Sequence, residues 1–375
     1  MPLITLAASP LLRLPDELLA AIGECFRAMD SSTAATEALA CLAGVNRRLL
    51  SIVVPILWRS HVFSKGPGKR AKTTETLRKY GEHIKDLTVV LRSVASQFGS
   101  EFEAVAEWLP FCSNVETFTL ETYTITHSRR GLWRHEGGQE DGDVEATIGP
   151  ASLGAGLRPL ADLGAQLRSL DIGVTFDSKI LADDVTLLLS VAPNLRRLSL
   201  LPTDFDVPLA ENDSVPVIPA MPLLKTLEIE SGNFLRADAA ICLPGLEDLD
   251  VGYLDPDGLS RGRTHLFTSL RCLTLQTFDM PRRFFSSFID PKTPIEAVYL
   301  FALSGDTFDD LQDFVKSQPR QTISKITVES SEDPQVDRER VKECFEWAAG
   351  RGIEVDALWP KPIAYRRTLV ISPPV

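Results

Sequence analysis

The chain has 375 residues, of which 44% are hydrophobic and 24% are charged, proportions typical of a folded globular protein that exclude wholesale disorder. Its 39 Lys and Arg against 51 Asp and Glu give a formal net charge of −12. This acidic balance argues against a dedicated nucleic-acid-binding protein, which usually carries a basic face, and against a chain held on anionic lipid.

The sequence predicts a protein of the cytoplasm and/or nucleus. No apolar run approaches the roughly 18 residues that a membrane span needs. The first residues lack the basic region that begins a secretory signal. The six cysteines are scattered without a C-x-x-C pair, which favours reduced and mostly buried thiols. We therefore expect neither a membrane nor a nucleic acid as partner.

Residues 14–58 are predicted to form a bundle of three or four short helices. Apolar residues recur with helical spacing over 14–26. Pro15 lies in the first turn of this segment, where a missing N–H costs nothing. A second apolar stripe runs over 39–53, and Pro55 is expected to end it.

This segment resembles an F-box. The resemblance rests on Leu-Pro-x-Glu-Leu-Leu-x-x-Ile from Leu14, Leu-x-x-Leu-x-x-Val-Asn-Arg-Arg-Leu from Leu39, and Pro-x-Leu-Trp-Arg from Pro55. It implies that the module docks onto the Skp adaptor of an SCF cullin-RING ubiquitin ligase. The adaptor-binding residues that it implies are Leu14, Pro15, Glu17, Leu18, Leu19, Ile22, Leu42, Val45, Asn46, Leu49, Pro55, Leu57 and Trp58.

The alternative interpretation is a helical cap on a larger domain, in which Leu-Pro is only a common way to start a helix. A module of this size cannot bury both faces of its helices internally. Some of its leucines must therefore pack on something else, either an adaptor or the following domain.

Beyond the module, the pattern apolar-x-x-apolar-x-apolar recurs nine times. The copies begin at Ile84, Val115, Leu167, Leu195, Leu224, Leu246, Leu270, Ile295 and Ile323. Most spacings lie in or near the leucine-rich-repeat range of about 20–29 residues. Each copy ends in period-two alternation, which predicts a strand with one buried face.

These patterns predict an α/β fold class, with a short N-terminal all-α module followed by an irregular leucine-rich-repeat-like solenoid with a parallel sheet. The repeats lack a fixed Asn after the strand, and so are similar to the degenerate repeats of fungal-type F-box proteins. The alternative is a doubly wound α/β domain, which would have continuous apolar strands and longer helices.

The expected organisation is a helical module at 1–63, a connecting segment at 64–83, the solenoid at 84–358 and a C-terminal tail at 359–375. Within the solenoid, residues 127–158 are polar and Gly-rich, which predicts a mobile insertion. We interpret this insertion either as a solvated insert that the fold tolerates or as a loop that binds a ligand. A helix near 341–348 and a strand at 353–358 are predicted to close the array.

No catalytic constellation, metal site or cofactor site is predicted. A phosphate-loop fragment lacks the full spacing, and a literal G-x-S-x-G at 258–262 lies in a polar loop. The paired acids Asp183 and Asp184, and likewise Asp309 and Asp310, are interpreted as caps of following helices. We therefore expect a protein that is not an enzyme.

The third, fifth and seventh positions of each repeat are predicted to face the open side of the sheet. The target-binding candidates on that face are Arg197, Glu228, Glu230, Asp248, Asp250, Tyr299 and Phe301. Like charges across a ladder are mildly destabilising, so the four acids suggest a basic partner segment, with a hydrated acidic face as the alternative. The two aromatic residues are interpreted as exposed interface anchors or as covered by the C-terminal tail.

Two functions follow from these expectations. The first is a substrate receptor of an SCF-type ubiquitin ligase, which binds the Skp adaptor and an unknown protein target. The alternative is a leucine-rich-repeat-like interaction scaffold with no link to a ligase.

Overall fold

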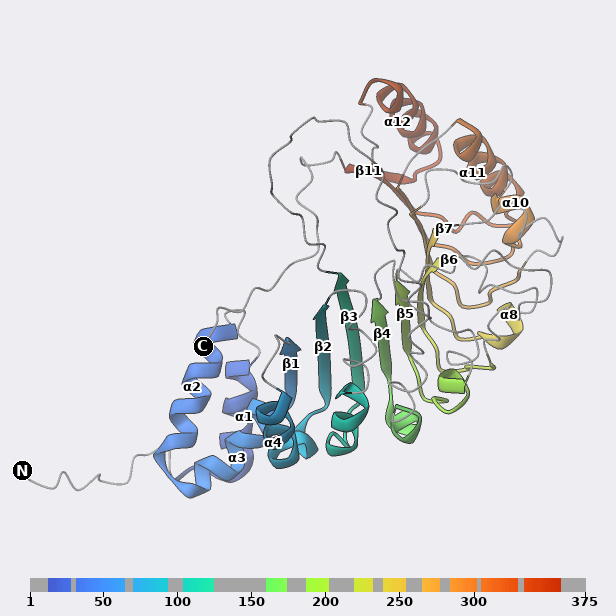
Figure 1. Cartoon of the computed structure of the whole chain (residues 1–375). Helices are drawn as coiled ribbons and strands as arrows, with labels where there is room; N and C mark the ends of the chain where they lie inside the picture. The colour runs from blue at the N-terminus through green and yellow to red at the C-terminus, as the bar shows by residue number, and fades with distance from the viewer. Residues whose placement is uncertain are drawn as a thin grey trace, which may run out of the picture. The chain divides into compact units, whose positions relative to one another are not determined.

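The structure, a computed structural model, describes residues 13–27, 32–64, 70–93, 104–124, 160–173, 187–201, 219–231, 239–253, 265–276, 284–301, 305–329 and 334–358. The chain divides into two compact units, Met1–Ala192 and Pro193–Val375 (Figure 1). This division falls inside the predicted solenoid and not after residue 63. The predicted insertion at 127–158 and the tail at 359–375 lie outside the described residues.

The first unit begins with the predicted helical module. Its helices are α1 (Asp16–Arg27), α2 (Ser32–Val45) and α3 (Arg47–Trp58). The Asn46 side chain accepts a hydrogen bond of 2.8 Å from the Leu49 N–H and so caps the start of α3. The expectation that Pro55 ends this helix is wrong, because α3 continues to Trp58.

The three helices have a core of their own. Leu39, Val53 and Ile56 are almost fully buried, and Phe26 is among the partly buried side chains that pack against them. At Gly23 on α1, a Cβ atom would lie 2.7 Å from Ile56 Cδ1. The absence of a side chain at Gly23 therefore lets α1 and α3 approach closely.

The described part of the first unit also has four strands, which pair in parallel in chain order: β1 (Ser60–Ser64), β2 (Asp86–Ser93), β3 (Thr117–Thr124) and β4 (Ser169–Gly173). Helix α4 (Arg70–Tyr80) lies between β1 and β2. The sheet thus begins at Ser60, inside the segment predicted to be helical. The predicted connecting segment at 64–83 contains α4.

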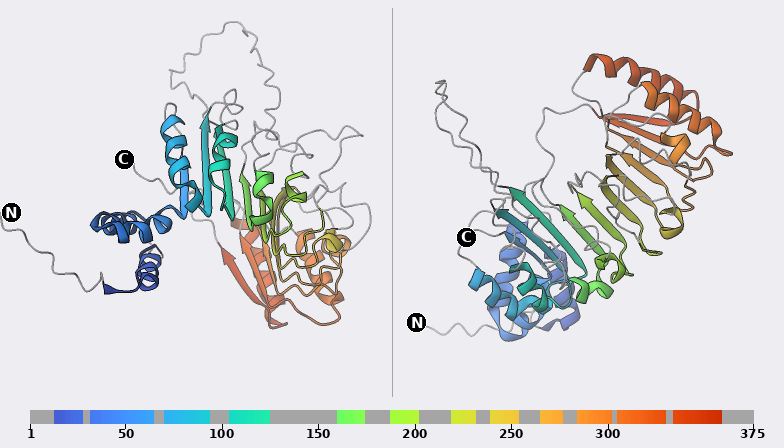
Figure 2. Two further views of the ribbon diagram at one scale, coloured as in Figure 1. Left: turned by 90° about the horizontal axis from the view of Figure 1, so that it is seen from below. Right: turned by 45° about the vertical axis from the view of Figure 1, so that its right-hand side comes forward.

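Among its described residues, the second unit has seven strands that also pair in parallel in chain order. They are β5 (Arg197–Leu201), β6 (Thr226–Ser231), β7 (Asp248–Tyr253), β8 (Cys272–Leu275), β9 (Ala297–Leu300), β10 (Lys325–Glu329) and β11 (Glu354–Leu358). Its helices are α8 (Ala239–Cys242), α10 (Phe284–Phe288), α11 (Gly305–Ser317) and α12 (Pro334–Ala349). In this unit α10, α11 and α12 lie on one side of the sheet (Figures 1 and 2).

The predicted fold class is confirmed. All nine copies of the repeat fall on strands, from β2 to β10, and the predicted closing helix and strand are α12 and β11. The fourth and sixth positions point into the core: Leu227 and Ile229, for example, are 0% exposed. The described α-helices between strands range from the four residues of α8 to the 16 residues of α12, and the parallel strands in chain order match a leucine-rich-repeat-like array.

The same turn starts successive strands. The Lys85 carbonyl accepts hydrogen bonds from the N–H groups of Glu116 and Thr117, at 2.7 and 2.9 Å. The Lys225 carbonyl does the same for Glu247 and the residue after it. Ion pairs join the side chains at this position, Lys85 to Glu116 at 2.8 Å and Lys225 to Glu247 at 2.6 Å. Because these pairs are partly exposed, each contributes at most about 1 kcal/mol.

One of the two expectations about paired acids is corrected. Asp309 and Asp310 do not cap the start of a helix but lie within α11, where Asp310 is buried and accepts a hydrogen bond of 2.7 Å from the Phe285 N–H. Asp310 therefore satisfies the first turn of a different helix, α10. Asp183 and Asp184 lie outside the described residues.

The cysteines are all free thiols, but the expectation that most are buried is wrong. Only Cys112 and Cys344 are buried, and Cys25, Cys41 and Cys272 are exposed. Burial raises the pKa of Cys112 to about 12 and that of Cys344 to about 11.

Across the described ranges, no helix is long and apolar enough to cross a membrane.

Candidate protein-binding surfaces

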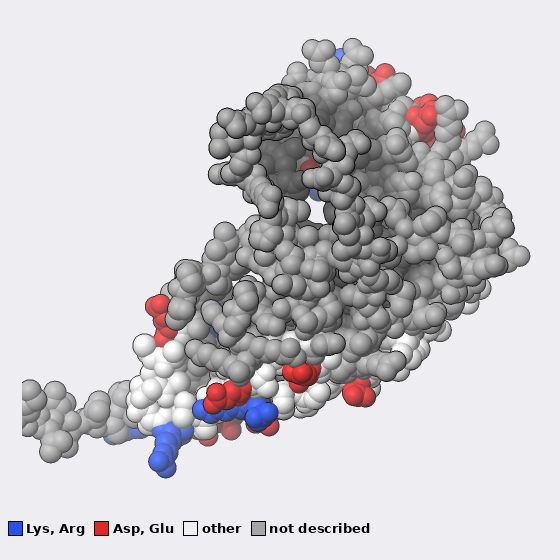
Figure 3. Space-filling model, viewed as in Figure 1, with Lys and Arg blue, Asp and Glu red and all other residues white. Residues whose placement is uncertain are grey.

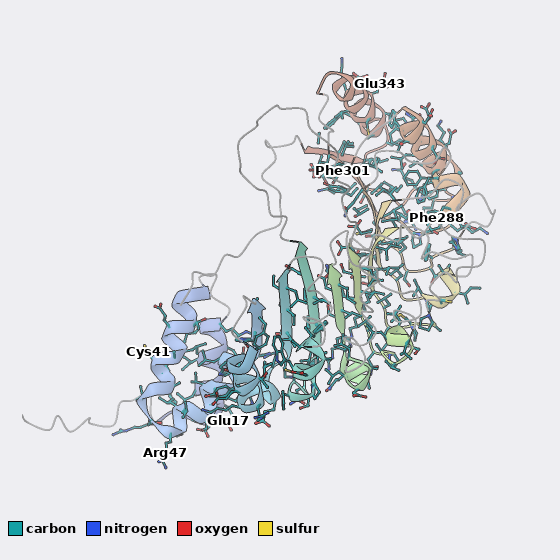
Figure 4. The ribbon with its side chains drawn as sticks, viewed as in Figure 1. Glu17, Cys41, Arg47, Phe288, Phe301 and Glu343 are labelled. Carbon is teal, nitrogen blue, oxygen red and sulfur yellow. The ribbon has the colours of Figure 1, made fainter. Side chains whose placement is uncertain are left out.

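The first candidate surface lies where the N-terminal ends of α1 and α3 meet. Arg48 Nη2 lies 2.6 Å from Asp16 Oδ1, and this ion pair joins the two ends. Glu17 and Arg47 lie at this same end of the module (Figure 4). The end of α2 is there too, since α2 finishes at Val45, two residues before α3 begins.

Three large apolar side chains at this end remain open to solvent. Leu18 is 51% exposed, Val45 is 58% exposed and Leu50 is 45% exposed. We call these three residues the helix-end patch. Over α2 the surface is largely uncharged, with basic side chains at its lower end (Figure 3). Exposed apolar residues with a charged rim are typical of a protein-binding surface.

The structure sorts the implied adaptor-binding residues by exposure. The exposed ones are Pro15, Glu17, Leu18, Val45 and Pro55. The partly buried ones are Leu14, Ile22, Leu42, Asn46, Leu57 and Trp58, and the buried ones are Leu19 and Leu49. The buried leucines hold the module together and are not available for docking. Leu50 was not among the implied residues, although its position off the helical stripe of Leu49 and Val53 is visible in the sequence.

Trp58 belongs to an aromatic stack and not to an open surface. Its ring stacks on Tyr80 at 4.5 Å and on His61 at 4.9 Å between centroids. The stack continues from His61 to Phe63 at 4.3 Å and from Phe63 to Trp108 at 5.9 Å. Burial lowers the pKa of His61 to about 4, so its ring is neutral at neutral pH. Trp58 therefore joins α3 to β1 and α4.

The second candidate surface is a row of side chains on neighbouring strands, on one face of the sheet of the second unit. Ser199 pairs with Glu228, Glu228 with Asp250, Asp250 with Thr274, and Thr274 with Tyr299 in the strand register. We call Ser199, Glu228 and Asp250 the acidic row. The predicted adjacency of Glu228 and Asp250 on neighbouring strands is confirmed.

Both acids of the row have partners. Arg197 Nη2 lies 3.2 Å from Glu228 Oε2, and Gln276 Nε2 donates to both carboxylate oxygens of Asp250 at 2.9 Å. The side chain of Glu230 lies outside the described residues. The candidate acids are thus part of a hydrogen-bonded network, and Gln276 is a member that the sequence analysis did not select.

The candidate aromatic residues are less open than an interface anchor would be. Tyr299 is partly buried, and its hydroxyl donates a hydrogen bond to the Glu329 carboxylate on the next strand. Phe301, which follows β9, is also partly buried (Figure 4). Tyr299 therefore contributes to cross-strand packing whatever else it binds.

The folded protein disfavours the ionised form of Asp250. Burial and the neighbouring Glu228 carboxylate raise its pKa, the hydrogen bond from Gln276 and the charge of Arg197 lower it, and the net result is a pKa of about 6. The folded protein therefore binds a proton at Asp250 more tightly than the unfolded chain does. Stability contributed by this proton is present below about pH 4 and is lost as the pH rises through about 6.

Asp250→Asn is consequently expected to stabilise the second unit at pH 7.5 by about 1–2 kcal/mol, a figure reduced from the full shift because the carboxylate is partly exposed. The gain should shrink steadily as the pH falls from 7 to 4.5. Urea unfolding of wild type and variant across this range measures the difference. A gain that is independent of pH would show that ionisation of Asp250 carries no cost.

No family model matches this chain, and no curated protein matches it either. In the part of the chain that the structure describes, no group of three or more His, Cys, Asp or Glu side chains could hold a metal ion. The two surfaces are therefore interpreted from their own residues and contacts.

Proposed function

We propose that this protein is the substrate-receptor subunit of an SCF-type cullin-RING ubiquitin ligase. The F-box-like module at 1–63 would dock onto the Skp adaptor, and the repeats would hold a protein target. The chain would perform no chemistry itself. Its contribution would be proximity, because holding a target lysine near a charged conjugating enzyme makes the transfer effectively intramolecular.

The observation that carries this proposal is the helix-end patch. The module already has a complete core in Leu39, Val53 and Ile56, and yet Leu18 and Val45 remain more than half exposed. The described residues of the following sheet do not cover them. Since exposed apolar side chains of this size favour a partner, an adaptor explains the patch better than packing within the chain.

The test is direct binding of the full chain to purified Skp adaptor, measured by calorimetry. We expect micromolar or tighter binding, and a loss of at least tenfold, about 1.4 kcal/mol, in the double variant Leu18→Asp, Val45→Asp. Because both side chains are exposed, the variant should keep the thermal unfolding midpoint of wild type.

A matched control is Ile241→Asp, which changes an 81% exposed apolar residue on α8 in the other unit. This variant should bind the adaptor as wild type does. If wild type fails to bind the adaptor at micromolar concentration, the proposal is wrong and the interaction scaffold without a ligase link replaces it.

A further inference from the structure

The acidic row contains a buried hydroxyl that the fold does not use. Ser199 is 0% exposed, and its Oγ has no hydrogen-bond partner among the described residues. In the strand register it lies directly beside Glu228. Leaving a buried hydroxyl unpaired costs about 1–3 kcal/mol. Such a group therefore calls for a partner that the free chain does not supply.

Negative charge around this hydroxyl exceeds what the chain neutralises. Glu228 has an ion pair with Arg197, but Asp248 and Asp250 are held by neutral groups. The Gln276 amide donates to Asp250, and the Thr226 hydroxyl donates to Asp248 at 3.4 Å. The described Lys and Arg side chains form no ion pair with either Asp248 or Asp250. Asp248 and Asp250, two residues apart on β7, thus have no ion pair of their own, although the charge of Arg197 also acts on Asp250.

The missing partner is an organic cation rather than a metal ion, because the described acids form no cluster that could ligate a metal. An ammonium group carries three hydrogen-bond donors and a guanidinium carries five, and neither has an acceptor. Both suit a surface made of carboxylates and one hydroxyl. Glu228, Asp248 and Asp250 carry three negative charges against the one positive charge of Arg197, and two basic side chains would neutralise the difference.

We propose that the acidic row, together with Asp248, binds a peptide segment of the target that presents two Lys or Arg side chains. The inference rests on the proposed function for the identity of its ligand as a ligase target. The binding itself needs only the second unit. One basic side chain lies against Ser199 and Glu228, and the other lies between Asp248 and Asp250.

Binding of this kind depends on pH through Asp250. Its pKa is about 6 in the free protein. Below that pH, a cation that binds there must displace the proton from the Asp250 carboxyl group. The charged or titratable groups that face it are Glu228 and Arg197 across the sheet, Asp248 on its own strand, and Cys272 on the next strand. The affinity is expected to rise about fourfold between pH 5.5 and 7.5, as this carboxylate becomes ionised.

The experiment is fluorescence anisotropy of a labelled peptide with two adjacent Lys residues, added to the full chain at physiological ionic strength. A peptide with Gln at both positions is the ligand control. The site variant is Asp248→Asn, Asp250→Asn, which removes both carboxylates without removing the side chains. We expect it to weaken binding of the Lys peptide at least tenfold, and Ser199→Ala to weaken it about threefold.

A matched protein control is Asp309→Asn, Asp313→Asn on α11, because both side chains are exposed and the net charge changes equally. This variant should bind within twofold of wild type. Equal weakening in both double variants, or no preference of wild type for the Lys peptide over the Gln peptide, would overturn the proposal in favour of a hydrated acidic face. No adaptor is present in this assay, so the peptide site and the adaptor interaction can each fail without the other.

Discussion

Replacing Trp58 with Ala is expected to lower the free energy of unfolding of the first unit by about 3 kcal/mol. The ring lies in a stack with Tyr80 at 4.5 Å and His61 at 4.9 Å, so its removal takes contacts from two other elements as well as from α3. The helical module and the first strand should then lose their common aromatic contact. Urea unfolding followed by circular dichroism measures the change.

Trp58→Phe is the matched control for this variant. It keeps an aromatic ring in the stack and should cost less than about 1.5 kcal/mol. The pair also separates a structural role from a docking role. If Trp58→Ala unfolds like wild type but loses the adaptor, Trp58 is a docking residue and the stack contributes little to stability.

The strands were predictable because their pattern is local. In each copy, residues two positions apart point to the same face, so the alternation itself shows which side chains are buried. Strand β1 was not predicted, because the pattern requires an apolar residue at each buried position and His61 occupies one of these positions in β1. This histidine is accommodated by contacts with Trp58 and Phe63, and Trp58 lies in the preceding helix.

The candidate sites were predictable in position but not in their contacts. A shared repeat frame was enough to place Glu228 beside Asp250, because strands that start with the same turn keep the same register. Two hydrogen bonds, from Gln276 to Asp250 and from the first turn of α10 to Asp310, depend on how distant segments approach one another. A single sequence carries no local signal for such approaches.

The unpaired hydroxyl of Ser199 shows the same limit. The sequence placed Ser199 on the open face of the sheet, where a small polar residue is ordinary. Its complete burial without a hydrogen bond could only be found in three dimensions. The proposal that the acidic row binds a partner rests on the acids and the hydroxyl together, and not on the acids alone.

Gly164→Ala is expected to destabilise the first unit by about 3 kcal/mol, because the new methyl group would collide with backbone. A Cβ atom at Gly164 would lie 2.2 Å from the Val191 carbonyl oxygen in the next repeat. Gly81 occupies the same place, three residues before its repeat begins, and a Cβ atom there would lie 2.4 Å from the Phe111 carbonyl oxygen. Two glycines thus let successive turns of the array stack at backbone distance.

The collision cannot be relieved by a rotamer change, since the two nearest atoms, the Val191 carbonyl oxygen at 2.2 Å and its carbon at 2.7 Å, belong to the main chain. The matched control is Gly44→Ala in α2, where the added Cβ would have no atom within 4 Å apart from its chain neighbours and the backbone of its own helix. It should leave stability unchanged or raise it by up to about 1 kcal/mol, because alanine favours the helix. Urea unfolding of both variants checks the contrast. If Gly164→Ala unfolds at the same urea concentration as wild type, the turns have room to separate, and their close stacking does not hold the array together.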